Sequence, residues 1–153
     1  MCVQVGHQDY VVALAPIPSG KSPIVPGVGL VSGSRDKSVH VWDVEEGASV
    51  QTLQGHKYQV NAVGILSSGD VVSGGLDGVL NMWKAGKAIA SLSEHKAAIL
   101  SLCVLSSGQM LTGMAKPSTV LSQYVYTVCH RICENPRPIV SSCPVVVGHV
   151  AFS

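Results

Sequence analysis

The tightest constraint on how this chain can fold is a stretch of sequence that occurs twice. Segments 32–42 and 73–83 both run Ser-Gly, then Asp, then Trp, and corresponding positions lie 41 residues apart. A Gly-His pair precedes each copy, at Gly6-His7 and Gly55-His56, and an altered version stands at Glu94-His95. In a chain with such a period, each repeat is one supersecondary unit that must stack on its neighbours to bury its apolar face.

Gly-His, Asp and Trp at a period of about 40 residues are the landmarks of WD repeats, each of which forms one four-stranded blade of a β-propeller. Strand-like runs separated by turn residues fit this interpretation. They lie at 10–15, 30–32, 38–44 and 49–53 for the first blade, at 60–66, 71–74, 79–83 and 88–92 for the second, and at 99–105 and 110–113 for the start of a third. We therefore predict an all-β fold, a partial WD-repeat β-propeller of about two and a half four-stranded blades with an irregular C-terminal tail.

The repeat also predicts how the chain is divided. We expect a propeller fragment over residues 1–113, with blades at about 5–54, 55–93 and 94–113, the last incomplete, and then a non-repeat, poorly ordered tail over 114–153. In that tail, Lys116 and Ser122 stand where the repeat would place Asp and Trp.

The first copy differs from the second by an insertion. Segment 16–27 contains four prolines, and proline cannot donate a hydrogen bond to a β-ladder. We expect this segment to form a surface loop between the first two strands of the first blade.

Composition excludes several classes of function. Charged residues make up 12% of the chain and the net charge is +1, so no basic surplus exists to neutralise nucleic-acid phosphates. The most apolar window, 139–152, is shorter than the about 20 residues that a membrane-spanning helix needs, so we expect no membrane anchor. The five cysteines lack framework spacing and the N-terminus lacks a secretion signal, which favours a cytoplasmic or nuclear protein with reduced thiols.

We predict that the repeated polar residues form one hydrogen-bonded set in each blade. A buried Trp indole needs an acceptor, and His can link a hydroxyl to a carboxylate. The two sets are His7, Ser32, Asp36 and Trp42, and His56, Ser73, Asp77 and Trp83. Ser, His and Asp also form hydrolase triads, but a triad would not be copied at blade spacing. We interpret both sets as structural, and predict no catalytic residue and no enzymatic activity.

Three other patterns resemble functional sites. Gly20-Lys21-Ser22 matches the end of a phosphate-binding loop, but prolines stand where backbone N–H groups should hold the phosphate. The zinc-type ligands Cys129, His130, Cys133, Cys143 and His149 have a spacing that matches no common zinc site. His40 lies between Val39 and Val41, which take the opposite face of the strand, so we expect it to be exposed. We therefore predict no cofactor and no metal site.

A partner-binding face is predicted where the loops before each first strand and each turn Asp meet at one end of the propeller. The residues concerned stand three and five positions after each Gly-His histidine and directly before each turn Asp. They are Tyr10, Val12, Arg35, Gln59, Asn61 and Leu76. Tyr and Arg are frequent interface anchors. The alternative is that these six are ordinary rim residues.

Residues 5–113 resemble the propeller of plant phospholipase A-2-activating proteins. The resemblance rests on the runs GLVSGSRDKSVHVWDVEEGASVQTLQGHKYQV, GDVVSGGLDGVLNMWKAGKAIASLSEHKAAI and SSGQMLTG. It also rests on blade order: a blade with a long insertion, a short blade without Asp after Trp83, and Glu-His-Lys opening the next. The resemblance implies a non-catalytic, ubiquitin-binding adaptor of the ubiquitin–proteasome pathway in the cytoplasm and nucleus. It implies that ubiquitin or ubiquitinated proteins bind at Tyr10, Arg35, Gln59 and Leu76.

In the resembling family, further domains dock on the valosin-containing AAA unfoldase, and we expect that partner only where those domains are present.

Two alternatives to this adaptor stay open. Propellers have about four to eight blades, more than these residues supply. The chain is then either a generic WD-repeat module for interactions between proteins, or a truncated product without independent activity.

Overall fold

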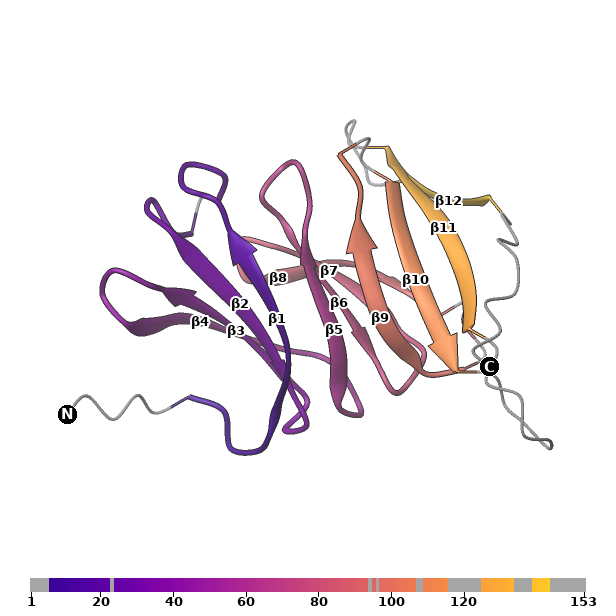
Figure 1. Cartoon of the computed structure of the whole chain (residues 1–153), viewed down its shortest axis with the longest axis horizontal. Helices are drawn as coiled ribbons and strands as arrows, with labels where there is room; N and C mark the ends of the chain where they lie inside the picture. Colours follow the sequence, from indigo (N-terminus) through magenta and orange to yellow (C-terminus); the bar gives the residue numbers. More distant parts are fainter. Residues whose placement is uncertain are drawn as a thin grey trace, which may run out of the picture.

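Three four-stranded antiparallel sheets, stacked side by side, make up the computed structural model of this chain (Figure 1). It describes residues 6–22, 24–93, 95, 97–106, 109–115, 125–133 and 139–143. The strands are β1 (Val11–Ile17), β2 (Gly29–Ser34), β3 (Ser38–Asp43) and β4 (Ala48–Gln54) in the first sheet, β5 (Val60–Ile65), β6 (Val71–Gly75), β7 (Leu80–Lys84) and β8 (Lys87–Leu92) in the second, and β9 (Ile99–Val104), β10 (Gln109–Ala115), β11 (Val125–Cys133) and β12 (Ile139–Cys143) in the third. Every regular element of the described residues is a strand, which confirms the predicted all-β partial propeller. Among these residues, no helix is long and apolar enough to cross a membrane.

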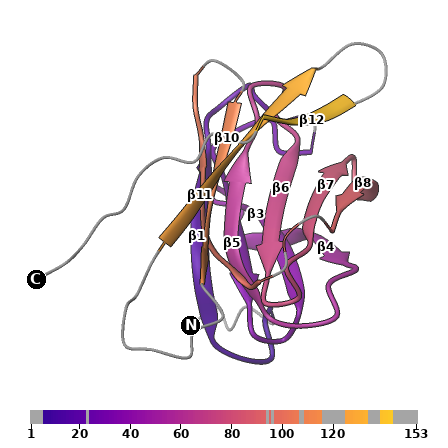
Figure 2. The same ribbon diagram turned by 90° about the vertical axis from the view of Figure 1, so that its right-hand side faces the viewer.

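Neighbouring sheets meet along their first strands. β5 lies between β1 and β9 (Figure 1), and each of the first two sheets then runs outward in strand order. The last strands, β4 and β8, therefore lie on the opposite side of the molecule from β1 (Figure 2). This is the arrangement of propeller blades, which surround a central channel.

The third sheet contains two strands that the repeat landmarks do not predict. β11 pairs with β10 from Gln109 opposite Arg131 to Ala115 opposite Val125, and β12 then pairs with β11. Backbone N–H and C=O groups make such ladders, so they form without the Asp and Trp of the earlier repeats. Within the tail, residues 125–133 and 139–143 are therefore strands.

The same strands carry part of the rejected zinc-type set. The backbone register places Cys129 opposite Cys143. His149 lies outside the described residues. The absence of a zinc site in this part of the chain stays a prediction.

Apolar side chains fill the two spaces between the sheets. The space between the first and second sheets holds Val31, Val39, Val41, Val60 and Trp83, and that between the second and third holds Val72, Leu80, Met82, Ile99 and Met110. Since successive residues of a strand point to opposite faces, adjacent residues such as Met82 and Trp83 are both buried only where a sheet is covered on both sides. The second sheet is such a sheet.

Part of the proline-containing insertion belongs to the core, which corrects the expectation of a surface loop. Ile17 extends β1 by pairing with Gly29, and both Ile17 and Val25 are fully buried. The insertion also packs on the second sheet, because a Cβ at Gly69 would lie 1.7 Å from the Lys21 carbonyl oxygen. Gly69 also has a φ of +85°. Glycine alone has no Cβ to collide with Lys21 and adopts this φ without strain, so this turn requires glycine.

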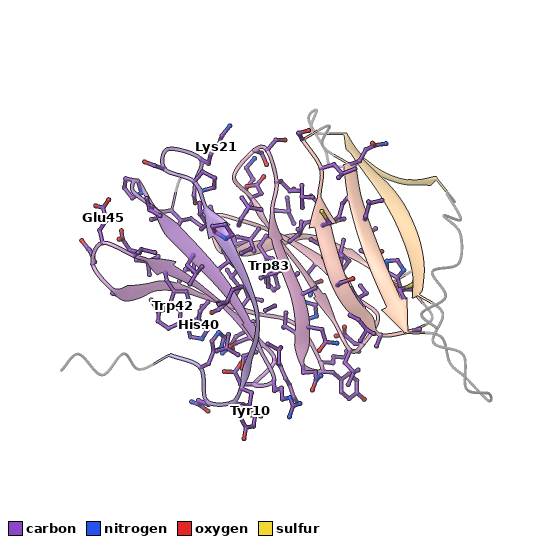
Figure 3. All side chains as sticks on the ribbon, viewed as in Figure 1. Tyr10, Lys21, His40, Trp42, Glu45 and Trp83 are labelled. Atoms are coloured by element: carbon purple, nitrogen blue, oxygen red, sulfur yellow. The ribbon has the colours of Figure 1, made fainter. Side chains whose placement is uncertain are left out.

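Hydrogen bonds join the polar set of the second blade. The Trp83 indole N–H donates to the Ser73 hydroxyl oxygen over 2.8 Å, and that oxygen lies 2.8 Å from Nε2 of His56. Nδ1 of His56 lies 3.4 Å from both carboxylate oxygens of Asp77. Because a carboxylate only accepts, Nδ1 carries the proton and Nε2 accepts from Ser73. Trp83 is 3% exposed and lies between the first and second sheets (Figure 3), where water cannot replace these bonds.

We expect Ser73→Ala to lower the free energy of unfolding by about 1–3 kcal/mol, because Trp83 and His56 would both lose a partner in the interior. Urea denaturation followed by tryptophan fluorescence measures this loss. The matched control is Ser93→Ala, at an exposed serine between strands, whose effect should stay within about 0.5 kcal/mol. Equal urea midpoints for the two variants would contradict a structural role for the Ser73 hydroxyl.

His56 should make the stability of the fold depend on pH. Burial lowers the pKa of His56 by more than the charge and hydrogen bond of Asp77 raise it. The unfolded chain then takes up the proton more readily, so the stabilisation is complete above the ordinary pKa of about 6.5 and is lost as the pH falls below it. We expect the urea midpoint to drop between about pH 7.5 and about pH 5.5, and to drop less in His56→Gln, which starts from a lower stability. An equally steep drop in His56→Gln would assign the pH dependence to other groups.

Candidate functional site

Tyr10 and Arg35 form the exposed centre of the predicted partner-binding face. Tyr10 is 72% exposed and precedes β1, and Arg35 follows β2. The Arg35 backbone N–H donates to the Tyr10 carbonyl over 3.0 Å, and the guanidinium carbon lies 5.3 Å from the centre of the Tyr10 ring. Such a cation–π contact contributes about 0.5–1 kcal/mol at an exposed site. It orients both side chains before any partner binds.

The second blade repeats this backbone arrangement with different side chains. The Leu76 N–H donates to the Gln59 carbonyl over 2.9 Å. The Gln59 side-chain amide donates to Asn61 over 2.8 Å, and the Asn61 amide donates to the carbonyl of Ile99 in the third sheet over 2.9 Å. Both amides are half-buried, whereas Leu76 is 45% exposed. The amides are therefore engaged within the protein, and Leu76 is the side chain of this group that is open to a partner.

Val12 and Asn61 occupy corresponding β-bulges. The register between β1 and β2 skips Val12, and the register between β5 and β6 skips Asn61. A bulge leaves one residue unpaired and re-aims its side chain. The residue five positions after each Gly-His histidine is therefore the bulge residue in both blades.

We call the six residues Tyr10, Val12, Arg35, Gln59, Asn61 and Leu76 the interaction face. The structure joins Tyr10 to Arg35, and Gln59 to Asn61 and Leu76. These two groups come from adjacent blades, because β1 lies beside β5. Tyr10 lies at the end of the molecule opposite the insertion that carries Lys21 (Figure 3).

In the first blade, the polar set makes the same hydrogen bonds as in the second. The Trp42 indole N–H donates to the Ser32 hydroxyl oxygen over 2.7 Å, and that oxygen lies 2.7 Å from Nε2 of His7. Nδ1 of His7 lies 2.9 Å from Asp36. The tighter contact between His7 and Asp36 distinguishes this blade from the second, where the corresponding distance is 3.4 Å.

Asp36 is held in its ionised form. Its carboxylate accepts from the backbone N–H groups of Gln8 and Ser38, at 2.8 and 2.9 Å. Burial raises the pKa of Asp36, but the hydrogen bonds from Ser38, Gln8 and His7 lower it by more, to well below its ordinary range. The carboxylate therefore stays available as an acceptor at any pH near neutrality.

The expectation of an exposed His40 was wrong, because the side chain is 7% exposed. Its ring centre lies 4.1 Å from that of His7, and the ring stacks on Trp42 at 5.5 Å with an interplanar angle of 26°. Its Nδ1 lies 3.0 Å from the Ser49 hydroxyl. Burial lowers the pKa of His40, a positive charge on His7 lowers it further, and Asp36 opposes the change. The valines beside His40 do face the second sheet, but His7 and Trp42 cover the other face.

His7, Asp36 and His40 form a group that we call the histidine cluster. In the ladders, Ser32 pairs with His40 and Ser73 pairs with Asn81, so the second blade has Asn81 at the corresponding position. Sequence reasoning missed the cluster, although one signal was present. His40 and Trp42 are two residues apart in one strand and therefore share a face.

Comparison with known proteins places this geometry among the WD repeats. A model of the WD domain, G-beta repeat, matches residues 1–43 and 47–84. The chain is 43% identical over 81 residues to the nuclear distribution protein PAC1 of Arthroderma otae, and 37% identical over 95 residues to the small ribosomal subunit protein RACK1y of Oryza sativa subsp. japonica. Each alignment covers 51% of this chain, but only 17% of PAC1 and 26% of RACK1y, so the chain spans a minor part of these relatives' length.

A solved structure agrees with the fold. The structure of U3-55K matches with a TM-score of 0.68, covering 89% of this chain and 38% of that chain at 20% sequence identity. At this identity the likeness concerns the fold alone. Because the repeat model matches more than half of the chain and the blades stack as propeller blades do, this chain belongs to the WD40 repeat family.

Proposed function

We propose that this WD-repeat module is a non-catalytic adaptor that binds ubiquitin or ubiquitinated proteins through the interaction face. The observation that carries the proposal is the Tyr10–Arg35 contact, which presents an exposed aromatic ring and a guanidinium in a set orientation. Tyr and Arg are enriched among the residues that contribute most of the binding energy of protein interfaces. Ubiquitin is supported as the partner by the resemblance of residues 5–113 to plant phospholipase A-2-activating proteins.

The chemistry of the interaction face suits a protein partner. Tyr10, Val12 and Leu76 are exposed apolar surfaces, and Arg35 adds a planar set of N–H donors beside them. Bonds within the protein already hold the side chains of Gln59 and Asn61. A surface whose side chains are ordered before binding loses less conformational entropy when a partner docks.

The wider role follows from the same resemblance. WD-repeat proteins are in general scaffolds rather than catalysts, and we assign no catalytic role to the polar sets. We place the adaptor in ubiquitin-dependent protein catabolism by the proteasome and in ubiquitin homeostasis, in the cytoplasm and nucleus. Docking on a valosin-containing AAA unfoldase belongs to the proposal only where the family's downstream domains are present.

Titration of ubiquitin into the isotope-labelled chain tests the proposal by nuclear magnetic resonance. We expect peaks of Tyr10 and Arg35 to shift, and the double variant Tyr10→Ala, Arg35→Ala to weaken binding at least about tenfold, because each truncated anchor costs about 1 kcal/mol or more. The matched control, Val44→Ala with Lys21→Ala, removes an exposed apolar side chain and a cation outside the interaction face. Its affinity should equal that of the unaltered chain.

The titration also separates the alternatives. No shifts at about 1 mM ubiquitin would exclude this partner and leave a WD-repeat module for another protein. Binding that survives the double variant would move the contact away from the interaction face. Circular dichroism and size-exclusion chromatography of the unaltered chain test whether it folds as a monomer, as an independently active module requires.

A further inference from the structure

The histidine cluster brings together three side chains with metal-ligand chemistry. One ligand atom from each of His7, Asp36 and His40 lies within 4.8 Å of the other two. Two imidazoles and a carboxylate are donors that suit Zn²⁺, Cu²⁺ and Ni²⁺. We propose that the histidine cluster binds a divalent transition-metal ion of this class. The pattern of cysteines and histidines in the sequence does not reveal this set, because His7 lies 29 residues before Asp36.

The spacing within the cluster favours particular ions. Nδ1 of His7 and Oδ2 of Asp36 are 2.9 Å apart. Two donors at this separation, each about 2.0–2.1 Å from one ion, subtend an angle of about 90° at the ion. Tetragonal geometry with N and O ligands is preferred by Ni²⁺ and Cu²⁺, whereas structural Zn²⁺ sites are tetrahedral. Ni²⁺ is therefore the probe of choice.

The hydrogen bonds around His7 allow Nδ1 to change from a hydrogen-bond donor to a metal ligand. To present the lone pair of Nδ1, His7 must carry its proton on Nε2, which then donates to the Ser32 hydroxyl oxygen. That oxygen has two acceptor positions, so it can accept from His7 and from the Trp42 indole together. The ion then replaces the hydrogen bond between His7 and Asp36, and the bond from Trp42 to Ser32 is kept.

The second blade shows that the hydrogen bonds of the polar set form without a histidine at the position of His40. His56, Ser73, Asp77 and Trp83 make the same hydrogen bonds while Asn81 stands at the position of His40. In both blades the residue at this position also bonds a serine of the fourth strand, Ser49 in the first and Ser91 in the second. Because an amide is enough for that bond, the bond does not by itself require an imidazole 4.1 Å from His7, whereas binding an ion does.

Access also differs between the two blades. Trp83 lies between the first and second sheets, whereas the labelled His40 and Trp42 side chains lie on the side of the first sheet that faces away from the second (Figure 3). The side chains of His7 and Asp36 are 3% and 12% exposed, against 1% and 6% for His56 and Asp77 in the second blade. The Asp36 carboxylate is the most open of these groups, so an ion has more access to the cluster of the first blade than to the polar set of the second.

Titration of NiCl₂ into the full chain tests the proposal by calorimetry and by tryptophan fluorescence. Trp42 is a built-in reporter, because its ring stacks on His40, and bound Ni²⁺ quenches nearby indoles. We expect one saturable event with quenching, and a loss of affinity of at least about tenfold in His40→Asn, which gives the first blade the residue found in the second. His130→Asn, which removes a histidine from β11 of the third sheet, is the matched control and should bind as the unaltered chain does.

Each outcome decides the proposal. Equal Ni²⁺ affinity and quenching in His40→Asn and the unaltered chain would overturn it, as would the absence of saturable binding. Circular dichroism checks that His40→Asn is folded, and His40→Gln repeats the test with a longer amide. As a measurement that needs no variant, saturating Ni²⁺ should raise the thermal midpoint of the unaltered chain, because an ion that binds only the folded state stabilises it.

Discussion

In each of the first two blades, the other features depend on the hydrogen bonds of one serine hydroxyl. It accepts from the tryptophan on the third strand and bonds the histidine before the first strand, and that histidine reaches the carboxylate of the turn. Four parts of each blade are thereby joined through one hydroxyl oxygen and one imidazole. The interaction face inherits its order from these bonds, because Tyr10 follows His7 by three residues and Arg35 directly precedes Asp36.

The eight strands of the first two blades could be predicted because each landmark has a physical task at a strand end. Tryptophan and serine must meet in the interior, and histidine and aspartate must reach them from the loops. A chain that keeps these residue types at constant spacing therefore keeps the strands between them. The interaction face could be located for the same reason, since its residues are counted from the same landmarks.

Other features could not be predicted, because they depend on contacts that leave no pattern in the sequence. β11 and β12 pair through backbone groups that every residue type carries. The burial of Ile17 and Val25 results from packing of the insertion on the second sheet. The prolines of the insertion do not predict that packing. The burial of His40 depends on His7, which comes from a segment more than thirty residues earlier and lies over the same face of the sheet.

The paired bulges have a consequence for how such a module changes its specificity. Val12 and Asn61 stand outside the β-ladder, at the same place in successive blades, and they already differ in size and polarity. A residue that pairs with no neighbour can be exchanged without a cost in ladder hydrogen bonds or in register. Val12 is such a position in the first blade, where recognition can diverge while the scaffold stays the same, whereas Asn61 bonds the carbonyl of Ile99 in the third sheet and belongs to the scaffold. A stack of repeats can in this way acquire different partners one blade at a time.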